Sequence, residues 1–81
     1  MYWVYILRCG DGTLYTGTAA DVDRRVKTHN SGRGAKYTRS RLPVEAVYRE
    51  AVSDKSAALR REAAIKKLRR AEKLALIEKK A

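Results

Sequence analysis

The feature that most constrains this chain is a short apolar run close to its start. Residues 2–9 read Tyr-Trp-Val-Tyr-Ile-Leu-Arg-Cys, a run rich in aromatic and β-branched side chains. It is too short and too uniformly apolar for an amphipathic helix, so the pattern predicts a buried strand at the centre of a sheet. A chain of 81 residues has room for one hydrophobic core. We therefore expect a single domain, residues 1–81, built around this strand.

Turn and capping signals divide the rest of the chain. The sequence Gly10-Asp11-Gly12 predicts a hairpin turn. Asp21 is a candidate N-cap of one helix, and either Ser53 or Asp54 is a candidate N-cap of another. The predicted elements are strands over 2–9, 13–18 and 44–50, helices over about 21–30, 53–68 and 72–80, and a basic loop over 32–42, with Pro43 opening the third strand. This order predicts the α+β fold class, with a three-stranded, mainly antiparallel sheet flanked by helices.

Positive charge dominates the composition and is unevenly distributed. The formal net charge is +10, from 19 Lys and Arg against 9 Asp and Glu. Residues 24–41 contain no acid, and their basic residues are Arg24, Arg25, Lys27, Arg33, Lys36, Arg39 and Arg41. Such a surface concentrates polyanions, and nucleic acid is the commonest of them. The alternative is a solvated surface that only aids solubility. A membrane-surface role is weaker, because no basic helix has large aromatics on its other face.

Composition also argues against several other classes of protein. Cys9 is the only cysteine, so we expect no disulfide, no disulfide-linked partner and no structural zinc site. Cys9 itself is expected to be a small apolar residue beside the hairpin turn. No apolar run approaches the ~20 residues of a membrane span, and the N-terminus lacks a signal-peptide pattern. We therefore expect a cytoplasmic protein with no membrane partner.

Two tyrosines are the first candidates for chemistry. Tyr5 and Tyr15 each lie inside a predicted strand, and an even hairpin register places both on the same face of the sheet. The structural alternative is an aromatic cross-strand pair, which is a common sheet stabiliser. The chain has 5 tyrosines and no phenylalanine. A core indifferent to hydroxyl groups would use phenylalanine somewhere, so a functional role stays open.

The first predicted helix carries an arginine and a histidine toward the core. Val22, Arg25, Val26 and His29 have the spacing of one helix face, and the valines indicate that this face is buried. A cation and a histidine on such a face need a polar cleft or buried partners. A lone histidine is usually structural, but this one is the only histidine of the chain and is paired with Arg25. Both interpretations stay open.

Glu62 has the same position on the next helix, with the opposite charge. It lies on one stripe with Ala58 and Ile65, and it is the only acid in the interior of that helix. A carboxylate at the edge of a core is a candidate ligand for one Mg²⁺, because hard cations prefer oxygen. The alternative is an ion pair with Lys66 at i, i+4, worth a few tenths of a kcal/mol at most.

Taken in order, these residues resemble the GIY-YIG endonuclease superfamily over essentially the whole chain. The matching positions are Trp3-Val4-Tyr5, Tyr15-Thr16-Gly17, Arg25, His29 and Arg61-Glu62. Any one triad is a weak signal, but five positions in order at the matching spacings are a strong one. The sequence departs from the family pattern at Trp3, which replaces a glycine, and at Thr16. The loop over 34–38 resembles the small single-domain bacterial branch, which is similar to the catalytic subunit of structure-selective resolvases.

The resemblance implies a metal-dependent endonuclease that hydrolyses phosphodiester bonds of DNA, including branched or single-stranded DNA, in DNA repair or recombination. It implies a single Mg²⁺ or Mn²⁺ ion on Glu62 and a transition-state contact from Arg25. Tyr15 would hydrogen-bond the phosphate or the attacking water. Tyr5 would be the general base, with His29 drawing its proton away, although His29 could act as the base itself.

The same resemblance and the charge pattern predict the nucleic-acid-binding residues. They are expected in the basic loop, at Arg33, Lys36, Tyr37, Arg39 and Arg41. A rival from another class is a non-catalytic DNA- or RNA-binding module that keeps the fold and the basic surface. A third, weaker hypothesis is a scaffold for an acidic protein partner.

Overall fold

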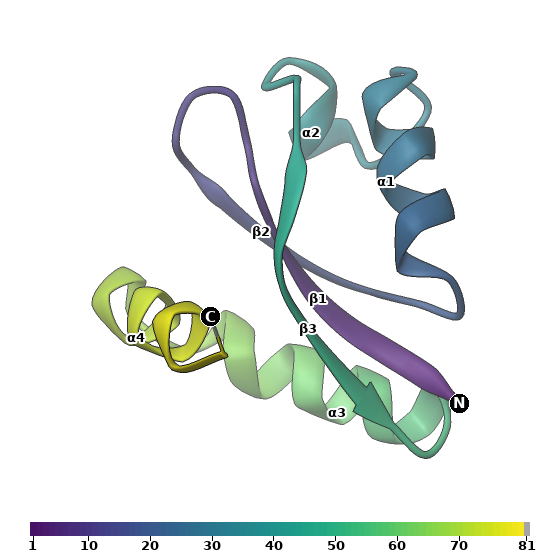
Figure 1. Cartoon of the computed structure of the whole chain (residues 1–81), viewed down its shortest axis with the longest axis vertical. Helices are drawn as coiled ribbons and strands as arrows, with labels where there is room; N and C mark the ends of the chain where they lie inside the picture. The colour runs from purple at the N-terminus through teal and green to yellow at the C-terminus, as the bar shows by residue number, and fades with distance from the viewer. Residues whose placement is uncertain (81) are drawn as a thin grey trace.

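The computed structural model describes residues 1–80, and its centre is an antiparallel sheet of three strands (Figure 1). The strands are β1 (Tyr2–Arg8), β2 (Leu14–Ala19) and β3 (Glu45–Val52), in the order β2-β1-β3. Both neighbours of β1 run antiparallel to it. The apolar run therefore forms the central strand, as its composition predicts.

Helices cover both faces of this sheet. The structure has α1 (Val22–Asn30), α2 (Lys36–Arg39), α3 (Lys55–Lys66) and α4 (Arg70–Lys80). Helices α1 and α2 lie on one side of the sheet, and α3 and α4 lie on the other (Figure 1). Within the described residues, no helix is long and apolar enough to cross a membrane. The predicted α+β class is confirmed.

The alternation of β1 side chains explains why this strand is apolar on both faces. Tyr5 and Leu7 pack toward α1, in the same cluster as Val22. Val4 and Ile6 point the other way and pack with residues of α3 and α4. A strand covered by helices on both sides has no solvated face, so it carries no alternating polar residues. Cys9, just beyond β1, is buried in the first cluster, as expected of a small apolar residue.

Side-chain caps fix where α1 and α3 begin. An Asp21 carboxylate oxygen accepts a hydrogen bond from the Arg24 backbone N–H at 3.1 Å, as predicted. Asp54, rather than Ser53, caps α3, because its carboxylate accepts from the Ala57 N–H at 2.8 Å. Helix α3 ends at Lys66, two residues earlier than expected, and α4 begins two residues earlier, at Arg70.

The region expected to be a basic loop is partly helical. Residues 36–39 form the single turn α2, which the sequence pattern did not predict because it has no side-chain cap. The Asn30 side chain, at the end of α1, hydrogen-bonds both backbone groups of Val44. Its amide nitrogen donates to the Val44 oxygen at 3.0 Å, and its amide oxygen accepts from the Val44 N–H at 2.8 Å. This amide joins the end of α1 to the start of β3. It holds the chain between these two elements against the α1 face of the sheet.

Candidate active site

The two tyrosines lie on one face of the hairpin, as the strand pattern predicts. In the observed register Tyr5 is opposite Gly17, and Tyr15 is opposite Leu7. Gly17 lies in the edge strand β2, and a Cβ atom built there would be 2.6 Å from the Tyr5 hydroxyl. The Tyr5 ring therefore crosses β2 at a position that has no side chain, and the hydroxyl reaches toward the edge of the sheet.

A buried hydrogen bond joins β1 to α1 at this point. The Tyr5 hydroxyl lies 3.2 Å from His29 Nε2, and the two side chains are 1% and 0% exposed. On the other side of the imidazole, His29 Nδ1 lies 2.8 Å from the Thr38 hydroxyl oxygen. That hydroxyl in turn donates to the Ala35 carbonyl at 2.9 Å. His29 is thus held between β1 and α2, with both ring nitrogens hydrogen-bonded.

Arg25 acts on the same tyrosine. It is half-buried on α1, and its guanidinium acts on the Tyr5 hydroxyl strongly enough to influence the pKa of that group. Burial raises the pKa of Tyr5 above its ordinary value of 10.0, and the hydrogen bond and charge of Arg25 oppose that rise. Tyr15 and Glu62 add smaller upward effects on this pKa. Burial, and then the charge of Arg25, lowers the pKa of His29. Near neutral pH both Tyr5 and His29 are therefore uncharged.

Tyr15 lies on the solvent side of this cluster. Its ring meets the imidazole of His29 edge-on, with centroids 5.5 Å apart, and it stacks on Tyr37 at 5.9 Å. The guanidinium carbon of Arg41 lies 3.9 Å from the centroid of the Tyr37 ring. Arg41 also forms an ion pair with Asp11 at 3.1 Å. Two of the five predicted nucleic-acid-binding residues, Tyr37 and Arg41, thus pack into an intramolecular stack.

The other predicted nucleic-acid-binding residues are more accessible. Arg33, Lys36 and Arg39 are all exposed. Arg39 donates from Nε to the Gly34 carbonyl at 3.3 Å. Lys36 and Arg39 are the first and last residues of the short helix α2, and Arg33 lies shortly before it. Thr38 of the same helix contacts His29.

Glu62 lies on the predicted stripe of α3, between the fully buried Ala58 and Ile65. Its side chain is 17% exposed, and one carboxylate oxygen pairs with Lys66 at 3.0 Å. The ion pair considered as the alternative is therefore present. Among the described residues no group of three or more His, Cys, Asp and Glu side chains is placed to hold a metal ion. Any ion at Glu62 would depend on this one carboxylate, with water and substrate as its other ligands.

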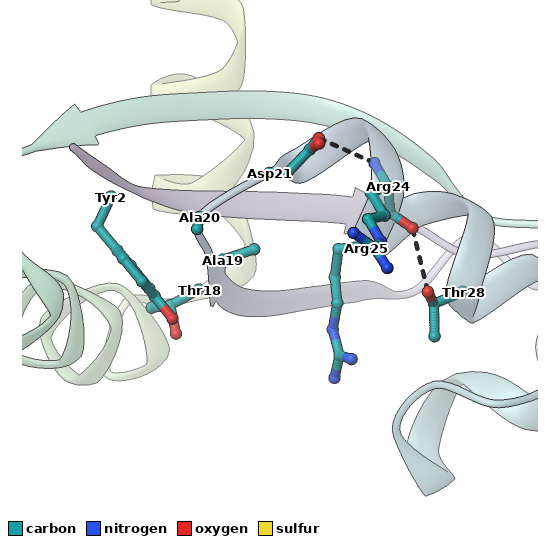
Figure 2. Close-up of a pocket in the computed structure, with 8 residues that line it drawn as sticks. All are labelled: Tyr2, Thr18, Ala19, Ala20, Asp21, Arg24, Arg25 and Thr28. Carbon is teal, nitrogen blue, oxygen red and sulfur yellow. Dashed lines mark hydrogen bonds between the residues drawn. The ribbon is translucent and has the colours of Figure 1, made fainter.

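A groove of about 420 Å³ opens beside this cluster, between the end of β2 and α1 (Figure 2). Its lining residues are Tyr2, Thr18, Ala19, Ala20, Asp21, Arg24, Arg25 and Thr28. In Figure 2 the Arg25 side chain extends away from the α1 ribbon into this space. Arg25 is the candidate site residue that lines this groove, and its charge also influences the pKa of Tyr5.

Three residues of the site were missed by sequence reasoning. Gly17 and Gly34 permit close approaches, since a Cβ at Gly34 would be 2.2 Å from His29 Nδ1. Thr38 is completely buried against the same nitrogen. For Gly17 the sequence did offer a signal, because it is the glycine of the Tyr15-Thr16-Gly17 triad. Nothing in the local pattern links Gly34 or Thr38 to a histidine several residues away.

Comparison with known proteins agrees with this geometry. The family model of the GIY-YIG catalytic domain matches residues 1–75. The chain therefore belongs to the GIY-YIG family, which is a family of nucleases.

Within that family the chain is similar to small bacterial UPF0213 proteins. One from Streptococcus agalactiae serotype V is 54% identical, with 94% of this chain and 86% of the relative covered. One from Staphylococcus epidermidis is also 54% identical, over 95% and 94%. The solution NMR structure of the UPF0213 protein from Bacillus halodurans has a TM-score of 0.60 and 49% identity, over 96% of this chain and 84% of that one. The predicted family and fold are confirmed, and the roles of the individual site residues stay predictions.

Proposed function

We propose that this protein is a divalent-metal-dependent endonuclease that hydrolyses phosphodiester bonds of DNA, in DNA repair or recombination. The observation that carries the proposal is the buried hydrogen bond between Tyr5 and His29 beside Arg25. It combines a proton donor, a neutral proton acceptor and a cation in one cluster, which is what attack of water on a phosphodiester requires. The nuclease family and the net charge of +10 support the same substrate class.

In this proposal Tyr5 and His29 move the proton of the attacking water. As water attacks phosphorus, its proton passes to the Tyr5 oxygen while the Tyr5 proton passes to His29 Nε2. The bond from phosphorus to the leaving oxygen breaks, and that oxygen takes a proton from solvent. Ionising a free tyrosine near neutral pH would cost about 4 kcal/mol. Transfer to His29 avoids a free phenolate, which the raised pKa of Tyr5 makes unfavourable.

Arg25 and Tyr15 would act on the phosphate itself. Arg25 lines the groove and influences the pKa of Tyr5, so a phosphate in the groove that engages Arg25 would approach the Tyr5 side of the cluster. Its guanidinium would stabilise the negative charge that grows on the phosphate oxygens. Tyr15, half-buried beside His29, would hydrogen-bond a phosphate oxygen or the attacking water.

The residues present fit a single Mg²⁺ or Mn²⁺ at Glu62. Mg²⁺ commonly keeps several waters and binds through one or two carboxylates together with substrate phosphates. The Lys66 partner of Glu62 is 53% exposed, so their ion pair is weak and gives way at little cost. A bound ion would supply Lewis-acid activation of a non-bridging phosphate oxygen.

The test is a cleavage assay on single-stranded, duplex and branched DNA, with and without Mg²⁺ or Mn²⁺. We expect metal-dependent cleavage by the wild-type protein and none by Glu62→Ala. Because the substitution removes a negative charge near phosphate, DNA binding without metal should be unchanged or slightly tighter. Glu78→Ala is the matched control, since Glu78 is an exposed acid on α4.

A further variant separates the role of Arg25 from that of the metal ligand. Arg25→Ala should lower the cleavage rate by ~10²–10³ and also weaken binding, because Arg25 would meet phosphate before the transition state as well. Wild-type protein that cleaves no DNA form faster than Glu62→Ala would contradict the nuclease proposal. The non-catalytic nucleic-acid-binding module would then be the better interpretation.

A further inference from the structure

A continuous chain of hydrogen bonds passes through the buried histidine. It runs from the Tyr5 hydroxyl through both nitrogens of His29 to the Thr38 hydroxyl. It ends at the backbone carbonyl of Ala35, 2.9 Å from the Thr38 oxygen. The chain connects β1, α1 and the start of α2.

The carbonyl end of this chain fixes its direction, and that direction leaves the Tyr5 proton pointing to His29 Nε2. A carbonyl can only accept, so the Thr38 proton is directed to Ala35. The Thr38 oxygen therefore accepts from His29 Nδ1, which must carry the proton. Only this direction gives every donor in the chain an acceptor.

Burial makes the alternative tautomer unfavourable. His29 and Thr38 are 0% exposed, and Tyr5 is 1% exposed. If His29 carried its proton on Nε2, the Tyr5 proton would lose its acceptor within this buried cluster. A buried donor without a partner is costly. Gly34 contributes as well, because its missing side chain lets the segment before α2 close onto the imidazole.

We propose that Thr38 is a positioning residue that holds His29 in the Nδ1–H tautomer and so keeps the Nε2 lone pair available to the Tyr5 proton. The inference rests on the proposed function for its catalytic consequence. The tautomer itself does not depend on that function. Thr38 would therefore act through His29 without touching substrate.

The first test reads the tautomer directly. In protein with ¹⁵N-labelled histidine, the only imidazole signals are those of His29. At pH 7.5 we expect Nδ1 to show the chemical shift of a protonated ring nitrogen and Nε2 that of an unprotonated one. In Thr38→Val, which keeps the side-chain shape but removes the hydroxyl, the two shifts should average or exchange places. Thr38→Ser should restore the wild-type pattern.

A variant at the other end of the chain provides the matched comparison. Tyr5→Phe removes the other partner of the imidazole and leaves Thr38 in place, so it should retain the Nδ1–H tautomer. A wild-type spectrum with the proton on Nε2 would overturn the proposal, whether or not Thr38→Val folds. A well-folded Thr38→Val that keeps the Nδ1–H tautomer would overturn it too, as would a Tyr5→Phe protein in which the tautomer reverses.

The second test reads the catalytic consequence. Thr38→Val should lower kcat for DNA cleavage by about 10²-fold, since the general base loses its proton acceptor. Its KM should change less than about twofold, because Thr38 does not contact substrate, and Thr38→Ser should recover most of kcat. Loss of kcat that serine does not rescue would contradict a hydroxyl role. If wild-type protein cleaves no DNA, the nuclease proposal fails, and the tautomer measurement still decides the role of Thr38.

Discussion

At the scale of single residues, the site depends on a place where a side chain is missing. Gly17 is opposite Tyr5, and a Cβ there would come within 2.7 Å of the ring as well as 2.6 Å of the hydroxyl. Tyr5 is buried against the sheet and bonded to His29, so it cannot move without breaking that contact. The third position of the Tyr15-Thr16-Gly17 triad is therefore glycine for a steric reason.

We predict that Gly17→Ala displaces the Tyr5 hydroxyl from His29. The overpacked site should cost about 1–3 kcal/mol of unfolding free energy. Cleavage of DNA should fall at least tenfold in protein that still folds. Urea denaturation measures the first effect, and the cleavage assay the second. An alanine variant with wild-type activity would show that Tyr5 does not need this geometry.

Thr16 precedes Gly17 in β2, and its side chain points to the opposite face of the sheet. A substitution at Thr16 is therefore a matched comparison for Gly17→Ala. The Thr16 side chain is 3% exposed, and among the described residues its hydroxyl oxygen has no hydrogen-bond partner. Thr16→Val keeps the shape and removes the unsatisfied hydroxyl. The variant should gain about 1 kcal/mol of stability and retain full activity. A loss of stability in urea denaturation would indicate a partner for this hydroxyl.

At the scale of elements, helix α1 carries two exposed cations that differ in their position relative to the groove. Arg24 lines the groove beside Arg25, whereas Lys27 does not. We predict that Arg24→Gln weakens DNA binding several-fold and lowers the slope of log affinity against log salt by roughly one counterion. Lys27→Gln makes the same change of charge on the same helix and should have little effect. Equal losses for the two variants, measured by fluorescence anisotropy at several salt concentrations, would rule out the groove as a strand path.

The segment around α2 should contribute to binding unequally. Arg33 and Lys36 are exposed, whereas Arg41 is already paired with Asp11 and stacked on Tyr37. Neutralising Arg33 or Lys36 should lower the salt slope by about one counterion for every DNA sequence. Neutralising Arg41 should lower it less, because Asp11 offsets its charge. Lys79→Gln, on α4, is the control. If the salt slope stayed unchanged after Arg33, Lys36 and Arg39 were replaced together, these cations would form a merely solvated surface.

At the scale of the whole molecule, His29 makes stability depend on pH. Burial and Arg25 lower its pKa in the folded protein, whereas an unfolded histidine titrates near pH 6.5. As pH falls below about 6.5, the unfolded chain therefore takes up a proton that the folded protein does not. Stability is fully present above that pH and is lost as pH falls toward the lowered pKa.

We therefore predict that the wild-type protein loses more unfolding free energy between pH 7.5 and 5.5 than His29→Gln does. The carboxylates titrate in both proteins, so their contribution cancels in the comparison. Urea denaturation at the two pH values measures it. Equal losses in the two proteins would mean that His29 has an ordinary pKa in the folded state.

The fold and much of the candidate site could be predicted from the sequence, because they depend on local periodicity. The apolar run of residues 2–9 predicted the central strand, and Asp21 predicted the start of α1. Strand alternation predicted that Tyr5 and Tyr15 share one face of the sheet, and helical spacing predicted that His29 and Glu62 point toward the core; the register and the burial of these residues agree. Each of these patterns is set by the geometry of a single element.

Only the tertiary structure decided how these elements meet. The turn α2 has no side-chain cap and forms where Thr38 packs on His29, so no local pattern marks it. The close approaches at Gly17 and Gly34, the Asp11–Arg41 pair and the Asn30–Val44 link all join residues that are separated along the chain. Such contacts depend on distances between packed elements, and periodicity carries no information about those distances. The sequence by itself determined which side chains turn inward, and the packing of α1 and α2 against the sheet determined which of them touch.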